Sequence, residues 1–157
     1  MITYPKIETL FERDEHHHIR PEALKKPAYS IISFWTVTVK VDGMNIRVLL
    51  GADNAVCIGG RTNAAQLPPD LIMSLMNTLP ADALAGLRKD ADPIPITLFG
   101  EGYGAGIQKG GAYRADKGFV LFDVLVGDRF WLDDDDVTGI AMRLGIPRVP
   151  VIGRGWT

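Results

Sequence analysis

Apolar and polar residues alternate on both sides of an Asp-Gly pair in the first third of the chain. Apolar and polar side chains alternate from Trp35 to Lys40 in the run Phe34–Lys40 and from Met44 to Val48 in the run Met44–Leu50, which is typical of half-buried β-strands. Asp42 and Gly43 lie between these runs, and an Asp-Gly pair in this position is the strongest local signal for a type I′ hairpin turn. The pattern therefore predicts a β-hairpin over residues 34–50.

The predicted hairpin would separate its side chains onto two faces. The expected opposite pairs are Val41 with Met44, Lys40 with Asn45, Val39 with Ile46, and Thr38 with Arg47. One face would be apolar (Val37, Val39, Val41, Met44, Ile46, Val48), and the other would carry Thr36, Thr38, Lys40, Asn45 and Arg47. A lysine on a polar face that contains an arginine suits phosphate chemistry, although an exposed hairpin with no such role can carry the same residues.

Periodicity and turn residues predict the other elements, among which strands dominate. Helices are expected over 21–26, from 68 to 79, over 81–88 and over 136–144, the last capped by Asp135 or Asp136 and followed by Gly145. Strands are expected over 55–59, 93–99 and 118–126, with a loop over 59–63, a glycine-dense loop over 100–111 and an extended tail from 147. This order predicts one α+β domain, residues 1–157, built on mostly antiparallel sheets.

Composition sets limits on the class of protein. The chain has 157 residues, 46% of them apolar and 23% charged, which is ordinary for one soluble globular domain. It contains no apolar run of membrane-spanning length and no signal peptide at its N-terminus, so we expect no membrane partner. Cys57 is the single cysteine, which excludes an internal disulfide and favours a reducing, cytoplasmic setting. The net charge of −2 argues against a wholly basic nucleic-acid-binding surface, but not against a local basic groove.

The glycine-dense segment Phe99–Gly111 is a candidate ligand loop. It is not a P-loop, because no Gly-Lys-Ser/Thr follows at the required spacing, and its glycines do not fit the dinucleotide fingerprint. Alternating glycines would leave the backbone close to a ligand, and Glu101 is the one carboxylate among them. A carboxylate there could accept hydrogen bonds from ribose hydroxyls. The alternative is a flexible connection in which Glu101 is merely solvated.

Two clusters of potential metal ligands are better interpreted as exposed surface. Adjacent side chains in the run His16-His17-His18 diverge, and no acidic or cysteine partner sits at ligand spacing. The run Asp133–Asp136 is expected to precede a helix N-terminus, where carboxylates are electrostatically favoured. A Mg²⁺ site at this second cluster remains open, but nothing in the sequence specifies it.

Four segments together resemble motifs of the covalent nucleotidyltransferases, the superfamily of ATP-dependent RNA and DNA ligases and mRNA capping enzymes. Lys40-Val-Asp-Gly43, extended to Arg47, resembles the nucleophile motif, and its RNA-ligase form more than its DNA-ligase form, because DNA ligases usually have arginine where Asn45 stands. The other three segments follow in the family's order. They are Gly60–Pro68, which resembles the arginine-bearing segment, Phe99–Gly111, which resembles the motif whose glutamate holds the ribose, and Phe119–Val124, which resembles the strand whose first aromatic residue stacks on the adenine.

The resemblance implies a fold and a chemistry. The fold would be the ATP-grasp-like nucleotidyltransferase fold of DNA ligases and mRNA capping enzymes, and the cofactors would be ATP and Mg²⁺. Lys40 would attack the α-phosphorus of ATP, release pyrophosphate and carry AMP as a lysyl-AMP phosphoramidate. The AMP would pass to an RNA 5′-phosphate, which a 3′-hydroxyl then attacks, so that RNA ends are joined as in nucleic-acid repair.

The resemblance also implies roles for individual residues. Glu101 would orient the ribose, Phe119 the base, and Arg61 a phosphate or the RNA end, and the rest of the nucleotide-binding set would be Asp42, Gly43, Asn45 and Arg47. Phe122 would lie on the face of its strand opposite to Phe119, so that one of the two could line a pocket. A free lysine with a pKa near ~10.4 is protonated at neutral pH, so its pKa must fall before the amine can attack. We expect Arg47, diagonal to Lys40 in the predicted hairpin, and a half-buried sheet environment to lower it.

Some features of the family are missing from the sequence. Val39 stands where RNA-ligase relatives often have a glutamate, the last lysine is Lys117, and the only Glu-Gly pair is Glu101-Gly102. The family's later Glu-Gly strand motif and Lys-x-Lys motif are therefore absent. We expect the N-terminal part of an adenylation domain, C-terminally incomplete and weak or inactive alone. The alternatives are a non-catalytic nucleotide- or RNA-binding module that needs a homodimer or a complementing chain, and a capping-type guanylyltransferase.

Overall fold

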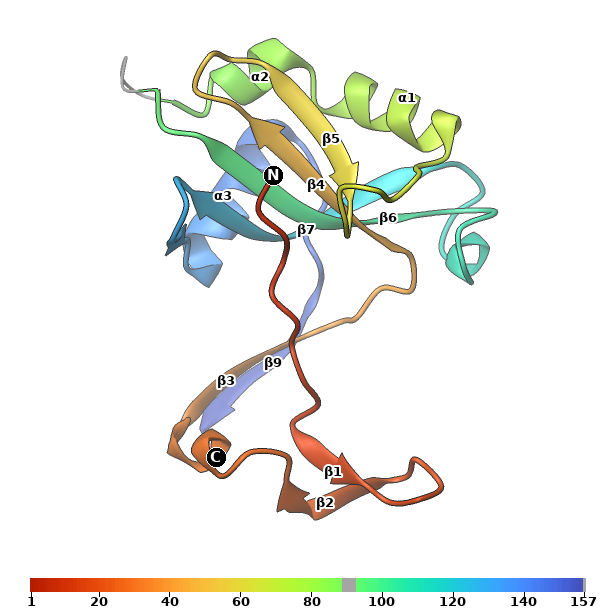
Figure 1. Ribbon diagram of the computed structural model, residues 1–157, viewed down its shortest axis with the longest axis vertical. Helices are drawn as coiled ribbons and strands as arrows, with labels where there is room; N and C mark the ends of the chain where they lie inside the picture. Colours follow the sequence, from red (N-terminus) through yellow and green to blue (C-terminus); the bar gives the residue numbers. More distant parts are fainter. Residues whose placement is uncertain (89–92, 157) are drawn as a thin grey trace. The chain divides into compact units, whose positions relative to one another are not determined.

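The computed structural model describes residues 1–88 and 93–156, and these form two compact units (Figure 1). One unit comprises Met1–Tyr4 and Lys40–Val149, and the other comprises Pro5–Val39 and Pro150–Thr157. No helix in the described part of the chain is long and apolar enough to span a lipid bilayer.

The larger unit contains a five-stranded antiparallel sheet. Its strands, in spatial order, are β5 (Val56–Gly60), β4 (Met44–Leu50), β6 (Ile96–Tyr103), β7 (Gly118–Val126) and β8 (Phe130–Trp131). The mixture of helices with antiparallel sheets confirms the predicted α+β class. β4 and β6, which carry the candidate site residues Asn45, Arg47 and Glu101, lie side by side in this sheet.

Three α-helices share one hydrophobic core with this sheet. They are α1 (Pro69–Thr78), α2 (Ala81–Ala85) and α3 (Asp134–Leu144), and a short 3-10 turn (Gly110–Ala112) precedes β7. Every second residue of β4, from Ile46 to Leu50, faces this core, because successive strand residues point to opposite sides. The core residues fill the helix-covered face of the sheet: Ile46, Val48, Leu50, Leu71, Leu75, Leu79, Leu84, Leu87, Ile96, Leu98, Ile107, Phe119, Leu121, Val124, Val137, Ala141 and Ile146.

Local signals explain where the helices begin and end. Pro69 occupies the first turn of α1, where its missing N–H costs no hydrogen bond. The side chain of Asp133 accepts a hydrogen bond from the backbone N–H of Asp136 and caps α3, so the predicted cap at Asp135 or Asp136 is wrong by two or three residues. Gly145 ends α3 with a φ of 64°, as predicted. The predicted second helix is shorter than expected and ends at Ala85.

The smaller unit consists of two separate two-stranded antiparallel sheets. β1 (Phe11–Arg13) pairs with β2 (Ile19–Leu24), and β3 (Phe34–Thr38) pairs with β9 (Val151–Trp156), with a 3-10 turn at Pro27–Ile31 between β2 and β3. No described residue of this unit is fully buried. The predicted helix over 21–26 is wrong, because most of that segment lies in β2.

The predicted hairpin over 34–50 is also wrong. β3 pairs with β9, with Phe34 opposite Trp156, whereas β4 has β5 on one edge and β6 on the other. Neither Asp42 nor Gly43 has the positive φ that a type I′ turn requires. Both edges of β4 are therefore taken by other strands, and β3 has no edge of β4 to join. The glycine-dense loop also begins later than predicted, since β6 continues to Tyr103.

Candidate nucleotide-binding site

Gly43 brings the Lys40–Gly43 segment against β6. A Cβ atom at this position would lie 2.3 Å from the carbonyl oxygen of Gly102 and 2.9 Å from Cγ of Glu101, closer than real Cβ contacts. The backbone N–H of Gly43 donates a hydrogen bond to the Glu101 carboxylate. Glycine is therefore required here for close approach to β6, and not for the left-handed turn that the sequence pattern indicated.

The Glu101 carboxylate lies within the electrostatic reach of both charged residues of this segment. Burial raises its pKa most strongly, the ammonium group of Lys40 and the Gly43 N–H oppose this, and the charge of Asp42 adds to the increase. The net result is a pKa above the usual value. The structure thus brings together Lys40, Asp42, Gly43 and Glu101, four of the residues proposed from the sequence.

Asn45 completes this group from the neighbouring strand. It lies directly opposite Glu101 in the pairing of β4 with β6, so both side chains point to the same face of the sheet. Its Oδ1 atom is buried, and no described residue donates a hydrogen bond to it. Buried polar atoms are normally hydrogen-bonded. Two adjacent oxygen acceptors, one of them without a donor, fit a ligand that presents hydroxyl groups, as a ribose does.

Arg47 occupies a different environment from the one predicted. Its side chain is 0% exposed, and its guanidinium donates to the carbonyl oxygens of Met1, Ile2 and Gly60 and to Oδ1 of Asn63. Burial lowers the pKa of Arg47. Because the hairpin does not form, the diagonal contact with Lys40 expected from it is wrong, and Lys40 itself is exposed rather than half-buried.

Phe119 is separated from Glu101 by the sheet. It is 4% exposed and belongs to the helix-covered core, with its ring 2.3 Å from the point where a Cβ of Gly100 would lie. Glycine at position 100 therefore makes room for this ring. The structure does not bring Phe119 together with the residues around Glu101.

Other aromatic residues lie on the same face as Glu101. Phe99 shares this face because it is two residues away on β6, and Tyr4 packs on it with a ring-centroid distance of 5.2 Å. Tyr4 also contacts Phe122 at 5.0 Å and Trp131 at 5.6 Å. Strand alternation from the core-facing Phe119 places Phe122 on the face of this aromatic cluster, next to the point where the pairing of β7 with β6 shifts between Phe99 and Gly100. The strand alternation of Phe119 and Phe122 indicated that one of them lines the open face, but not which one.

Arg61 lies at the start of the loop that follows β5 and is exposed. Among the described residues, no hydrogen bond or ion pair joins Arg61 to the group around Glu101. A hollow of about 420 Å³ lies nearby at the β5 edge, lined by residues that include Met1, Leu49, Cys57 and Asn63. This hollow does not include Lys40 or Glu101.

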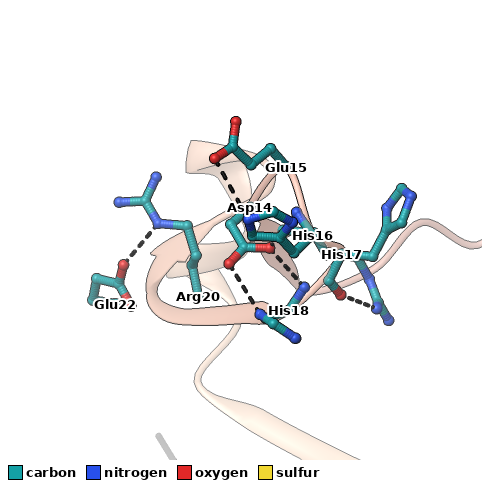
Figure 2. Close-up of polar contacts among 8 residues, drawn as sticks. Asp14, Glu15, His16, His17, His18, Arg20 and Glu22 are labelled. Atoms are coloured by element: carbon teal, nitrogen blue, oxygen red, sulfur yellow. Dashed lines mark hydrogen bonds and ion pairs between the residues drawn. The ribbon is translucent and has the colours of Figure 1, made fainter.

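The histidine run forms the turn between β1 and β2 (Figure 2). Oδ1 of Asp14 accepts hydrogen bonds from the backbone N–H groups of His16 and His18, and Oδ2 lies 3.2 Å from Nδ1 of His18. Nε2 of His16 lies 3.6 Å from the Glu15 carboxylate. These contacts close the turn, and both histidine side chains remain more than 70% exposed. The described residues contain no group of three or more His, Cys, Asp or Glu side chains that could hold a metal ion.

Comparisons with known proteins give the family and the fold of the chain. A family model described as RNA ligase matches residues 33–157. Solved structures of the RNA ligase of Naegleria gruberi share the fold. One mutant with ATP and Mn has a TM-score of 0.63 at 20% identity, over 78% of this chain and 37% of that one. The ligase with PPi has a TM-score of 0.65 at 19% identity, over 96% of this chain and 49% of that one.

The chain spans less than half the length of these ligases. A mutant with AMP and Mn gives a similar result, with a TM-score of 0.64 at 21% identity. A search of curated protein sequences finds no significant match. At these identities the structural likeness shows the fold.

Proposed function

The chain belongs to the RNA ligase family, and we propose that it is the nucleotide-binding part of an ATP-dependent RNA ligase that forms lysyl-AMP on Lys40. The observation that carries this proposal is the position of Glu101, which lies within electrostatic reach of Lys40 and opposite Asn45, whose buried Oδ1 atom has no donor among the described residues. Its ligands would be ATP and a divalent cation, and its second substrate an RNA with a 5′-phosphate and a 3′-hydroxyl end.

Each residue of this group has a task in the proposed reaction. Asn45 and Glu101 accept hydrogen bonds from the ribose hydroxyls, and the Gly43 N–H holds the Glu101 carboxylate in place. The uncharged amine of Lys40 attacks the α-phosphorus of ATP, the P–O bond to the β-phosphate breaks, and pyrophosphate leaves. A 5′-phosphate oxygen of the RNA then displaces Lys40, and a 3′-hydroxyl displaces AMP. Mg²⁺, when bound with the nucleotide, neutralises charge on its phosphates.

Transfer of label from ATP tests the proposal. The chain is incubated with Mg²⁺ and α-³²P-labelled ATP and separated on a denaturing gel, together with Lys40→Ala and the matched control Lys26→Ala, which removes an exposed lysine of the smaller unit. We expect weak label on the unaltered chain and on Lys26→Ala, and none on Lys40→Ala. Undiminished label on Lys40→Ala would contradict the assignment of the nucleophile. Robust label would contradict the expectation that the missing Lys-x-Lys motif limits the reaction.

A second candidate is a nucleotide- or RNA-binding subunit that requires another chain. The smaller unit favours it, because none of its described residues is fully buried and several apolar side chains are exposed, including Ile31 at 81%, Ile152 at 68% and Val37 at 50%. Isolated two-stranded ribbons are marginally stable in water. A homodimer or a complementing chain would cover this surface.

Light scattering combined with ATP titration separates the candidates. A dimer that binds ATP tightly without label transfer supports the binding subunit, whereas a monomer that transfers label supports the ligase fragment. A capping-type guanylyltransferase would use the same lysine chemistry, and a preference for GTP over ATP in both assays would identify it.

A further inference from the structure

Arg47 is a buried cation, and none of the described residues forms an ion pair with it. Its four hydrogen bonds, of 2.6 to 3.1 Å, all end on neutral oxygen atoms, namely three backbone carbonyls and the amide oxygen of Asn63. In the described residues no carboxylate lies within ion-pair distance of it. A charge removed from water without a counter-charge is costly to the fold. An anion at this position would therefore find a guanidinium already oriented.

Two of the four acceptors belong to the segment Met1–Tyr4, which we call the N-terminal strap. The Nη1 atom of Arg47 donates to the carbonyl oxygen of Met1 at 3.1 Å and to that of Ile2 at 3.0 Å. Tyr4 fixes the other end of the strap, because its hydroxyl donates to Asp123 and its ring packs on Phe99. The strap thus lies along the face of the sheet that carries Glu101, and in Figure 1 the N-terminus is drawn over β4 and β6.

The strap covers the surface next to the proposed ribose site. Arg47 is two residues from Asn45 on β4, and Phe99 is two residues from Glu101 on β6, so each pair shares a face with a spacing of roughly 6–7 Å. A nucleoside triphosphate is longer than this spacing. If the ribose lies at Asn45 and Glu101, the base or the phosphates of the nucleotide must extend to the neighbouring surface, where the strap lies.

We propose that Arg47 is a phosphate-binding residue that the N-terminal strap covers, and that the strap leaves when a nucleotide binds. The carbonyl oxygens of Met1 and Ile2 both accept hydrogen bonds from Nη1 of Arg47, so departure of the strap would free the N–H groups of this nitrogen for phosphate oxygens. A guanidinium matches phosphate geometry with two parallel hydrogen bonds, and such charge-assisted bonds are stronger than bonds to neutral carbonyls. This inference rests on the proposed function, because it places the phosphates of the same nucleotide.

Weakening the strap should strengthen nucleotide binding. Tyr4→Phe removes the hydrogen bond to Asp123 and keeps the ring, whereas Tyr4→Ala also removes the ring contacts. The matched control is Tyr113→Phe, at a tyrosine that is 51% exposed and outside the strap. Dissociation constants for ATP and for inorganic pyrophosphate are measured by calorimetry on the full chain. We expect Tyr4→Phe to bind both about tenfold more tightly, because a smaller share of molecules is covered, and the control to bind both unchanged.

A second measurement uses the unaltered protein and so does not depend on whether a variant folds. The terminal methyl of Met1 lies 2.5 Å from the point where a Cβ of Gly59 would stand. The ¹³C-methyl methionine signal of Met1, assigned in the unaltered protein by through-space contacts to the α-protons of Gly59, should move to the position of a solvent-exposed methyl when ATP is added.

The outcomes distinguish the inference from the proposed function. The inference is overturned if all three variants and the unaltered chain bind ATP equally, or if the Tyr4 variants bind it more weakly. Either result leaves the proposed nucleotide binding intact. An unmoved Met1 signal in the ATP-saturated protein overturns the inference as well. If the Tyr4 variants bind ATP more tightly but bind pyrophosphate unchanged, Arg47 does not contact the phosphates of the nucleotide. ATP that binds none of the proteins refutes the proposed function, and the inference with it.

Discussion

Replacing Gly43 with alanine tests whether the Lys40–Gly43 segment must lie against β6. The added Cβ would stand 2.3 Å from the Gly102 carbonyl oxygen, whereas ordinary van der Waals contact begins at 3.4 Å. The segment and β6 must therefore separate by about 1 Å. A hydrogen bond of normal length does not survive such a displacement, so the Gly43 N–H would lose the Glu101 carboxylate.

The magnitude follows from these two effects. A hydrogen bond to a charged group contributes about 1.5–3 kcal/mol, and steric displacement in a packed sheet costs a further ~1 kcal/mol or more. We expect Gly43→Ala to lower the free energy of unfolding by about 2.5–4 kcal/mol and to weaken ATP binding at least ~10-fold, because Glu101 no longer has a fixed position. Urea unfolding and calorimetric titration with ATP measure the two quantities.

Gly139→Ala is the matched control. Gly139 lies in α3, and nothing stands within 4 Å of an added Cβ. Alanine is favoured over glycine in a helix interior by about 1 kcal/mol, so this variant should be slightly more stable and should bind ATP as before. If Gly43→Ala behaved like Gly139→Ala in both assays, the required close approach of the two segments would be refuted.

Three further predictions test the site. Burial raises the pKa of Glu101, so its folded form binds a proton more readily than its unfolded form. The stability that this provides is present at acidic pH and is lost as pH rises from about 4 through the folded pKa. The free energy of unfolding of the unaltered chain should therefore fall relative to that of Glu101→Gln between pH 4 and pH 7, and a constant difference would argue against this. Asn45→Ala should weaken ATP binding about fivefold to tenfold, because one hydrogen-bond acceptor is lost. The control Asn77→Ala, on the exposed side of α1, should leave ATP binding unchanged. Equal effects of the two variants would show that Asn45 has no special role. Phe119→Ala should lower the free energy of unfolding by about 3–5 kcal/mol, as expected for a buried ring, while Phe119→Leu should keep the ATP dissociation constant within about twofold. A large loss of ATP binding by a well-folded Phe119→Leu variant would show that Phe119 contacts the nucleotide, as predicted from the sequence.

Local patterns in the sequence predicted the individual elements well. The apolar spacing of Leu71 and Leu75 marks the buried side of α1, and the glycine at position 145 ends α3 in a left-handed conformation. The continuous apolar run over 118–126 is β7. These signals depend on residues a few positions apart, so they are present in the sequence before any tertiary contact forms.

The partners of these elements depend on residues far apart in the chain. Phe34 pairs with Trp156, and the Asp-Gly signal beside β3 cannot reveal this, because it reflects only the residues next to it. The position of Arg47 is set by the carbonyl oxygens of Met1 and Ile2, and that of Tyr4 by Asp123. Motif resemblance proposed Lys40, Asn45 and Glu101 from the sequence, but the covered position of Arg47 and the core position of Phe119 required the structure.

Locating the AMP adduct on the protein tests the central claim most directly. The chain is incubated with ATP and Mg²⁺, digested at a pH that preserves phosphoramidates, and mapped by peptide mass spectrometry. The account predicts AMP on the peptide that contains Lys40 and on no other. AMP on a different residue, or an adduct of equal yield in Lys40→Ala, would contradict it.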